Sequence, residues 1–151
     1  MPLTNLRPPV SVRHLLNTKA QNILPFEDLT SRIISAAFRV HNTLGPGHLE
    51  HVYRNALALV LKLEGLDVQI EVVLPVHWGN VQVGRCEADL IVEKIVVVET
   101  KTGVGILAGH EVRLGAYLRS SGHEIGLLLN FGPVRVEVKR VVETRMGRKT
   151  G

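Results

Sequence analysis

Two carboxylates and a lysine stand near the ends of two strongly apolar segments. Asp89 lies within residues 87–92, and Glu99 and Lys101 come directly after residues 95–98. Charges at the end of a buried strand are costly unless they are paired, solvated or used in chemistry. Two neighbouring carboxylates form a hard-oxygen site suited to Mg²⁺ or Mn²⁺, and a nearby lysine can position a water molecule or accept its proton. These residue types are compatible with metal-assisted hydrolysis at a phosphoryl group, and also with solvated strand-end charges that form a cross-strand pair.

The strand register decides whether these side chains can meet. Glu99 and Lys101 are two residues apart, so they point to the same face of their strand. A three-residue loop beginning at Glu93 would place Asp89 opposite Glu99, whereas a two-residue loop would place Asp89 opposite Val98. Because a slip of one residue turns every side chain to the other face, the metal hypothesis predicts the three-residue loop or a bulge.

Hydrophobic periodicity predicts the elements that position these residues. Helices are expected over 29–43, 49–64 and 108–121, with Gly45-Pro46-Gly47 separating the first two. Strands are expected over 67–77, 81–92, 95–101, 125–130 and 134–141. The order ααβββαββ predicts an α/β domain with a central mixed β-sheet flanked by helices.

The same periodicity predicts which positions face the core. In the second helix the predicted apolar stripe comprises Val52, Ala56, Leu59, Val60 and Leu63. In the third helix it comprises Val112, Leu114, Tyr117 and Leu118, and in the first strand the alternating positions are Val68, Ile70, Val72 and Leu74. In each of these elements the named residues are expected to be buried on one face.

The two ends of the chain differ from the body at residues 29–142. Residues 1–28 are predicted to form an irregular basic N-terminal arm, with a short helix near residues 11–18, and residues 143–151 a basic C-terminal tail. An organelle transit peptide has a similar composition to the arm. An arm that docks on the domain or on a polyanion is the simpler interpretation.

The composition indicates a globular domain and is compatible with an anionic partner. The 151 residues are 45% hydrophobic and 21% charged, with a formal net charge of +4, which is compatible with binding nucleic acid. The sequence contains no run of about 18 apolar residues, the length that a membrane-spanning helix needs. The single cysteine, Cys86, excludes a disulfide framework and suits a cytoplasmic protein. The oligomeric state stays open, a homodimer included.

A further carboxylate stands at the start of the second helix. Glu50 falls in its first turn, where the helix dipole favours a negative charge, and Tyr53 shares its face. The pattern G-P-G-x-x-E-x-x-Y, followed by an aspartate and by Glu-x-Lys on two strands, resembles the GxxExxY proteins of the PD-(D/E)XK nuclease superfamily. The resemblance covers about residues 29–142 and includes residues 40–47 and 127–132.

Membership of that superfamily implies a restriction-endonuclease-like core and a metal-dependent phosphodiesterase site. Asp89 and Glu99 would bind Mg²⁺ or Mn²⁺ together with the main-chain carbonyl of Thr100. Lys101 would be the catalytic lysine, and Glu50 would complete or orient the site as a fourth catalytic residue and a further metal ligand. The implied function is that of a nuclease that hydrolyses phosphodiester bonds of nucleic acid, above all DNA, by endo- or exonucleolytic cleavage.

Three positions depart from the family pattern. Ala88 replaces the proline before the aspartate, Thr100 replaces an apolar residue, and Arg113 stands where glutamine is usual. The forked guanidinium of Arg113 could bind a phosphate, or the residue could mark a retuned or lost reaction. Arg113, Arg54 and Tyr53 are the predicted nucleic-acid-binding residues.

Other chemistries lack their motifs. The chain has no H-E-x-x-H zinc site, no nucleophile elbow and no G-x-x-x-x-G-K-[ST] loop, and His41 and His110 are expected to be hydrogen-bonded structural residues. One alternative is a catalytically weak or inactive module of the same fold that binds nucleic acid or a protein partner. Another is a metal-dependent hydrolase of a small phosphorylated molecule. The complete set of Asp89, Glu99 and Lys101 favours catalysis.

Overall fold

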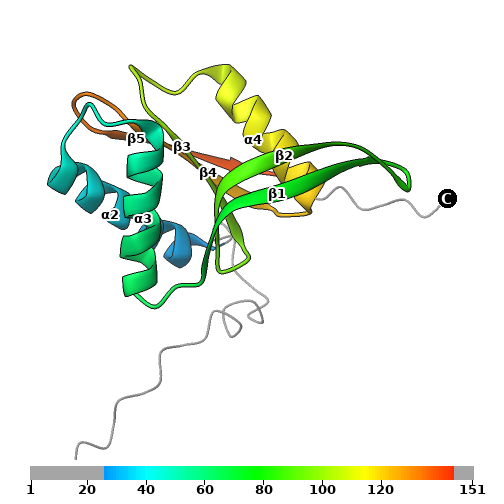
Figure 1. Ribbon diagram of the computed structural model, residues 1–151, viewed down its shortest axis with the longest axis horizontal. Helices are drawn as coiled ribbons and strands as arrows, with labels where there is room; N and C mark the ends of the chain where they lie inside the picture. Colours follow the sequence, from blue (N-terminus) through cyan, green and yellow to red (C-terminus); the bar gives the residue numbers. More distant parts are fainter. Residues whose placement is uncertain (1–25, 145–151) are drawn as a thin grey trace, which may run out of the picture.

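Three helices and five strands make up the computed structural model, which describes residues 26–144 (Figure 1). In chain order they are α2 (Glu27–Leu44), α3 (Glu50–Leu63), β1 (Val68–Trp78), β2 (Val81–Val92), β3 (Val96–Lys101), α4 (Ala108–Ser121), β4 (Ile125–Phe131) and β5 (Val136–Val142). The predicted order ααβββαββ is confirmed. The predicted helix near residues 11–18 and most of the basic tail lie outside the described residues.

The first helix begins earlier than predicted. α2 includes residues 27 and 28, which the sequence had placed in the arm. Both are acidic, and a negative charge in the first turn suits the helix dipole. The hydroxyl of Thr30 donates to the carbonyls of Phe26 and Glu27. Across residues 26–144, no helix is long and apolar enough to cross a membrane.

The sheet is mixed and has one parallel step. Its strand order is β1-β2-β3-β4-β5, with β3 and β4 parallel and every other neighbouring pair antiparallel. A parallel pair requires a crossover, which α4 supplies. α2 and α3 cover one face of the sheet and α4 covers the other (Figure 1).

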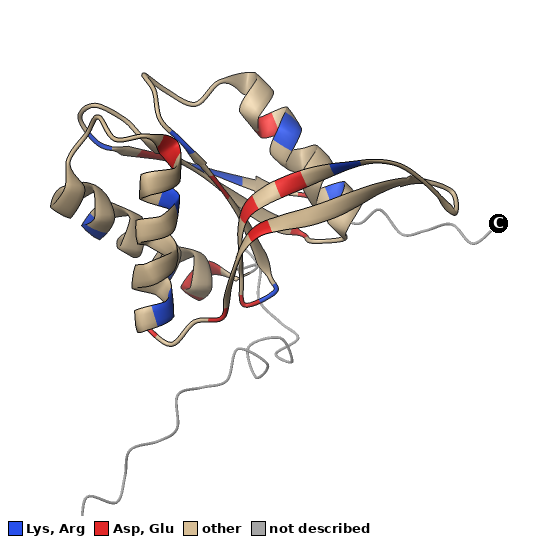
Figure 2. Ribbon diagram, viewed as in Figure 1, with Lys and Arg blue, Asp and Glu red and all other residues tan. Residues whose placement is uncertain are grey.

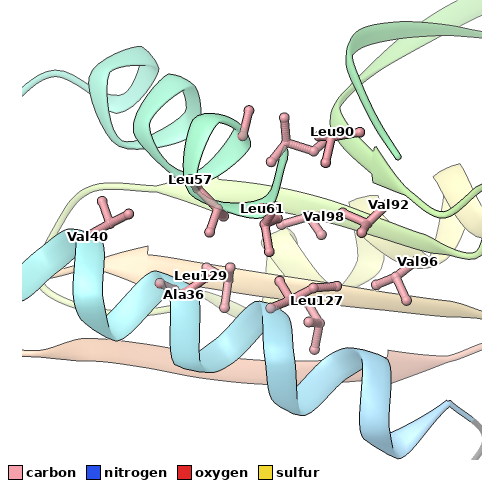
Figure 3. Close-up of a cluster of buried hydrophobic side chains, with 14 of the residues drawn as sticks. Ala36, Val40, Leu57, Leu61, Leu90, Val92, Val96, Val98, Leu127 and Leu129 are labelled. Atoms are coloured by element: carbon pink, nitrogen blue, oxygen red, sulfur yellow. The ribbon is translucent and has the colours of Figure 1, made fainter. Parts of the chain in front are cut away.

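The middle strand is buried on both faces, as its run of β-branched residues predicts. Val96 and Val98 belong to the core beneath α2 and α3, whereas Val97 packs in the smaller core beneath α4. All three have no exposed surface. Figure 3 shows Val96 and Val98 among the side chains of the larger core, with Leu127 and Leu129 from β4 beside them. This packing fixes the position of the polar end of β3.

The predicted apolar stripe of α3 is right in part: Ala56 and Val60 are partly buried and pack against the larger core, but Leu59 and Leu63 do not. The structure buries Tyr53, Leu57, Ala58 and Leu61, and leaves Leu59 and Leu63 at 59% and 78% exposure. The tyrosine sets the rotation of the helix: its ring stacks on Phe131 with centroids 4.6 Å apart, and its hydroxyl donates to the Gly45 carbonyl at 2.6 Å. In α4, Val112 is likewise exposed at 70%, although Leu114 and Leu118 are fully buried as predicted.

Two leucines of α3 test this rotation. Leu61→Ala should lower the free energy of unfolding by about 2–5 kcal/mol, because it leaves a cavity in the larger core. The matched change Leu59→Ala removes the same atoms from an exposed position and should alter stability by less than about 0.5 kcal/mol. Urea unfolding followed by circular dichroism measures both. Equal losses in the two variants would contradict the observed helix face.

The first hairpin changes sides along its length. Val68 packs in the core beneath α2 and α3, but Leu74 packs beneath α4, and Ile70 between them is 38% exposed. The four alternating positions predicted to share one face therefore do not. The strand turns at Glu71, whose φ of 53° is left-handed. Beyond Leu74 the hairpin extends from the body as a two-stranded ribbon (Figure 1), with Trp78 at its end 82% exposed.

Candidate active site

The sheet brings Asp89 and Glu99 together at the point where β2 and β3 part. The register pairs Leu90 with Val98, which corresponds to the predicted three-residue loop and puts Asp89 across from Glu99. Main-chain pairing of the two strands ends there. The amide of Asp89 donates to Glu99 Oε1 at 3.0 Å, so a side-chain oxygen serves as its acceptor in place of a main-chain carbonyl.

Thr100 completes the connection between the two strands. Its main-chain amide and its hydroxyl both donate to Asp89 Oδ2, each at 2.8 Å. The threonine has no exposed surface, and a buried hydroxyl needs such a partner. The sequence had left this residue unexplained; its position directly after Glu99, the residue across from Asp89, is the signal that could have identified its role. Thr100 holds one oxygen of Asp89 in place.

Helix α3 brings the fourth predicted residue to the same end of β3. Glu50 is the first residue of the helix, and its Oε1 lies 3.7 Å from Lys101 Nζ. Figure 2 shows acidic and basic segments close together beside the first turn of α3. The lysine side chain is 20% exposed and the glutamate 41%, so the ion pair is partly open to solvent. Its net contribution to stability is small for that reason.

Burial makes the Glu99 carboxyl group hard to ionise. Its pKa is raised from the ordinary value of 4.5 to about 8, chiefly by burial and then by the charge of Asp89. The Asp89 amide and the Lys101 ammonium act in the opposite direction. Burial, followed by Glu99, also raises the pKa of the Cys86 thiol and of the Tyr117 phenol. A cation bound at this site would favour the ionised form of both carboxylates.

The donor set fits a small hard cation. Within residues 26–144, nothing donates a hydrogen bond to Asp89 Oδ1 or Glu99 Oε2, so each carboxylate keeps one oxygen available. The N–H and C=O of one residue in an extended strand face the same neighbour, so the Thr100 carbonyl faces the β2 side, as its amide does. Two carboxylate oxygens and a carbonyl are ligands that suit Mg²⁺ or Mn²⁺.

The position of Glu50 does not match a third carboxylate ligand. In the part of the chain that the structure describes, no three His, Cys, Asp or Glu side chains are grouped so that they could hold one metal ion. Glu50 is instead paired with Lys101. Glu50 therefore lies at the end of β3 that carries Lys101, and its contact is with the lysine.

The three residues predicted to bind nucleic acid lie in different environments. Tyr53 is fully buried and uses its hydroxyl within the protein, so a nucleic-acid contact does not fit it. Arg54 is 16% exposed and its Nη1 lies 2.8 Å from Glu71 Oε1. Arg113 lies on the exposed surface of α4 and is the one of the three that can reach a phosphate freely.

The histidines predicted to be structural have structural partners. Nε2 of His41 lies 2.8 Å from the Gly132 carbonyl, and the buried ring stacks on Phe131. Nδ1 of His110 accepts a hydrogen bond from the Leu107 amide at the start of α4. Both predictions are confirmed, and both side chains stabilise elements around the site.

Sequence reasoning missed the polar residue beside Lys101 on the next strand. Asn130 pairs in register with Lys101 and is 2% exposed. Its Nδ2 donates to the Gly103 carbonyl at 3.0 Å, while no residue between 26 and 144 donates to its Oδ1. An asparagine within an otherwise apolar strand was the available signal. The Asn130 side chain stabilises the loop that follows Lys101.

Comparison with known proteins agrees with this geometry. The family model of the PD-(D/E)XK nuclease superfamily matches residues 27–141. The chain belongs to this superfamily, whose members are typically metal-dependent phosphodiesterases. The match extends from the first residue of α2 almost to the end of β5, so it includes every element that forms the site.

A solved structure has a fold similar to that of this chain. The crystal structure of SSO0001 is similar to this chain, with a TM-score of 0.52 and 20% sequence identity over 87% of this chain and 73% of that chain. Identity at this level shows a shared fold. A comparison with curated proteins gave no match.

Proposed function

We propose that this protein is a divalent-metal-dependent nuclease that hydrolyses phosphodiester bonds of DNA. The observation that carries the proposal is the meeting of Asp89 and Glu99 where β2 and β3 part, with the Glu50–Lys101 pair at the same end of β3. The resemblance to GxxExxY proteins, which rests on Glu50 and Tyr53 after Gly45-Pro46-Gly47, belongs to this proposal.

The metal ligands in this proposal are Asp89, Glu99 and the Thr100 carbonyl. Thr100 holds Asp89 Oδ2 and the Asp89 amide holds Glu99 Oε1, so the remaining oxygens are directed by bonds already made. A bound Mg²⁺ or Mn²⁺ would supply Lewis acidity toward the phosphoryl oxygen and the attacking water. Fixing the ligands before the substrate arrives reduces the reorganisation needed during the reaction.

Lys101 contributes positive charge and a proton site at the reacting centre. Its ammonium is placed by Glu50 and can hold the attacking water by a hydrogen bond or stabilise the charge that develops on the phosphoryl oxygens. Glu50 acts through the lysine, so it is a positioning residue. Arg113 is proposed to contact a phosphate of the substrate, since its exposed guanidinium suits an oxyanion.

The test is metal-dependent cleavage of labelled single-stranded, double-stranded and branched DNA, with RNA of the same sequences alongside. Cleavage of DNA should require Mg²⁺ or Mn²⁺ and should be lost in Asp89→Asn, which removes a ligand charge. The matched control is Glu124→Gln, because Glu124 is exposed beside the opposite end of the sheet. DNA binding without cleavage by the wild-type protein would favour the non-catalytic module, and cleavage of RNA alone would overturn the choice of DNA.

A further inference from the structure

Glu71 has a backbone conformation that is unusual for a residue inside a strand. Its φ of 53° lies in the left-handed region, which costs energy for any residue with a β-carbon. The other described non-glycine residues with positive φ are Phe26, Glu93 and Lys94, which stand before α2 and in the turn between β2 and β3. Among residues 26–144, Glu71 alone shows this conformation within a strand.

Glu71, the residue with the strained backbone, lies on β1 directly across from Asp89. Main-chain pairing of β1 and β2 passes from Ile70–Leu90 to Val72–Ala88 and omits the intervening pair of Glu71 and Asp89. In a regular central strand the amide of Asp89 would bond to a neighbouring main chain. Here it donates to Glu99 Oε1 at 3.0 Å. The interruption at Glu71 therefore coincides with the hydrogen bond that joins the two proposed ligands.

Arg54 holds the strained residue in place. Its Nη1 lies 2.8 Å from Glu71 Oε1, and the arginine is largely buried while the glutamate is half-exposed. Arg54 is one helical turn after Glu50 on α3, and Glu50 pairs with Lys101. The same helix thus contacts β1 and β3, the two strands that flank Asp89.

We propose that Glu71 is a positioning residue: its left-handed backbone, anchored by Arg54, interrupts the pairing of β1 with β2 and leaves the Asp89 amide to hold Glu99. Strained backbone persists where the surrounding structure over-determines it, and it concentrates at functional sites. The inference rests on the proposed function, because the ligands that it positions are those of the proposed metal site.

The decisive variants change the backbone preference at one position. Glu71→Val favours regular strand pairing, because a β-branched residue is strongly disfavoured at positive φ. It should weaken Mn²⁺ binding about ten- to a hundredfold, while the metal-free melting temperature stays the same or rises. Glu71→Asn keeps a side chain that tolerates the left-handed region, so its Mn²⁺ affinity should be close to that of the wild type. Gln69→Val, at an exposed and regularly paired position of β1, is the control.

The Arg54 anchor gives an independent test. Arg54→Met keeps the aliphatic stem and should weaken Mn²⁺ binding in the wild-type background but not in the Glu71→Asn background. Calorimetric titration with Mn²⁺ and a melting curve in chelator measure both properties without any substrate. Wild-type affinity in Glu71→Val, or equal losses in Glu71→Val and Glu71→Asn, would overturn the inference. Failure of the wild-type protein to bind Mn²⁺ would instead overturn the proposed function.

Discussion

Lys101→Ala is expected to slow metal-dependent DNA cleavage by about a hundred- to ten-thousandfold, the range of a positioned acid–base group. The lysine lies at the end of β3, two residues after Glu99, and its ammonium is 3.7 Å from Glu50 Oε1. Alanine removes the charge without altering the valines that anchor the strand. Single-turnover rates at saturating Mg²⁺ measure the chemical step, so the loss should appear in the rate constant and not in substrate affinity.

Two comparisons make this result specific to the site. Lys62→Ala changes the same residue type at an exposed position near the other end of α3, so it should cleave DNA at the wild-type rate. Lys101→Ala should still bind Mn²⁺, because the proposed ligands are Asp89, Glu99 and the Thr100 carbonyl. A wild-type rate in Lys101→Ala would remove the lysine from the mechanism. Loss of Mn²⁺ binding in this variant would mean that it disturbs the ligands.

The sequence was sufficient for the element order because its signals are local. A run of β-branched residues, a glycine-proline turn and a helical period each depend on a few neighbouring residues, and residues 95–101 carried enough information to predict a buried strand with a polar end. The metal hypothesis also predicted the register, since a three-residue loop or a bulge is needed to place Asp89 across from Glu99. The restriction-endonuclease-like core followed from the resemblance.

What could not be predicted depends on contacts between distant residues. The rotation of α3 is set by Tyr53 on Phe131, a contact between α3 and β4 that no period within the helix encodes. The change of face along β1 depends on a left-handed residue, and glutamate carries no sequence signal for that conformation. Thr100 was unexplained for the same reason, because its partner Asp89 lies on another strand.

Glu99→Gln is expected to stabilise the metal-free protein at alkaline pH and to leave it unchanged near pH 4. The pKa of Glu99 is raised from 4.5 to about 8 in the folded protein, by burial first and by Asp89 second. Below the lower value the carboxyl group is protonated in both the folded and the unfolded chain, so it has no effect on stability. Between the two values the folded chain keeps a proton that the unfolded chain has lost, so stability falls as the pH rises. Above about 8 the full cost of the buried charge applies, on the order of 5 kcal/mol.

Glutamine keeps the acceptor for the Asp89 amide but cannot ionise, so the pH dependence due to this residue should disappear. Urea unfolding of both proteins in chelator at pH 4, 6 and 8.5 measures the difference, and the exposed change Glu124→Gln controls for lost surface charge. Mg²⁺ added at pH 8.5 should restore stability to the wild type by binding the folded state, and should restore little to Glu99→Gln. Parallel pH profiles for the wild type and Glu99→Gln would show that Glu99 is not the buried acid. A metal effect of equal size in both proteins would show that the cation binds elsewhere, and the proposed nuclease site would then lose its main physical support.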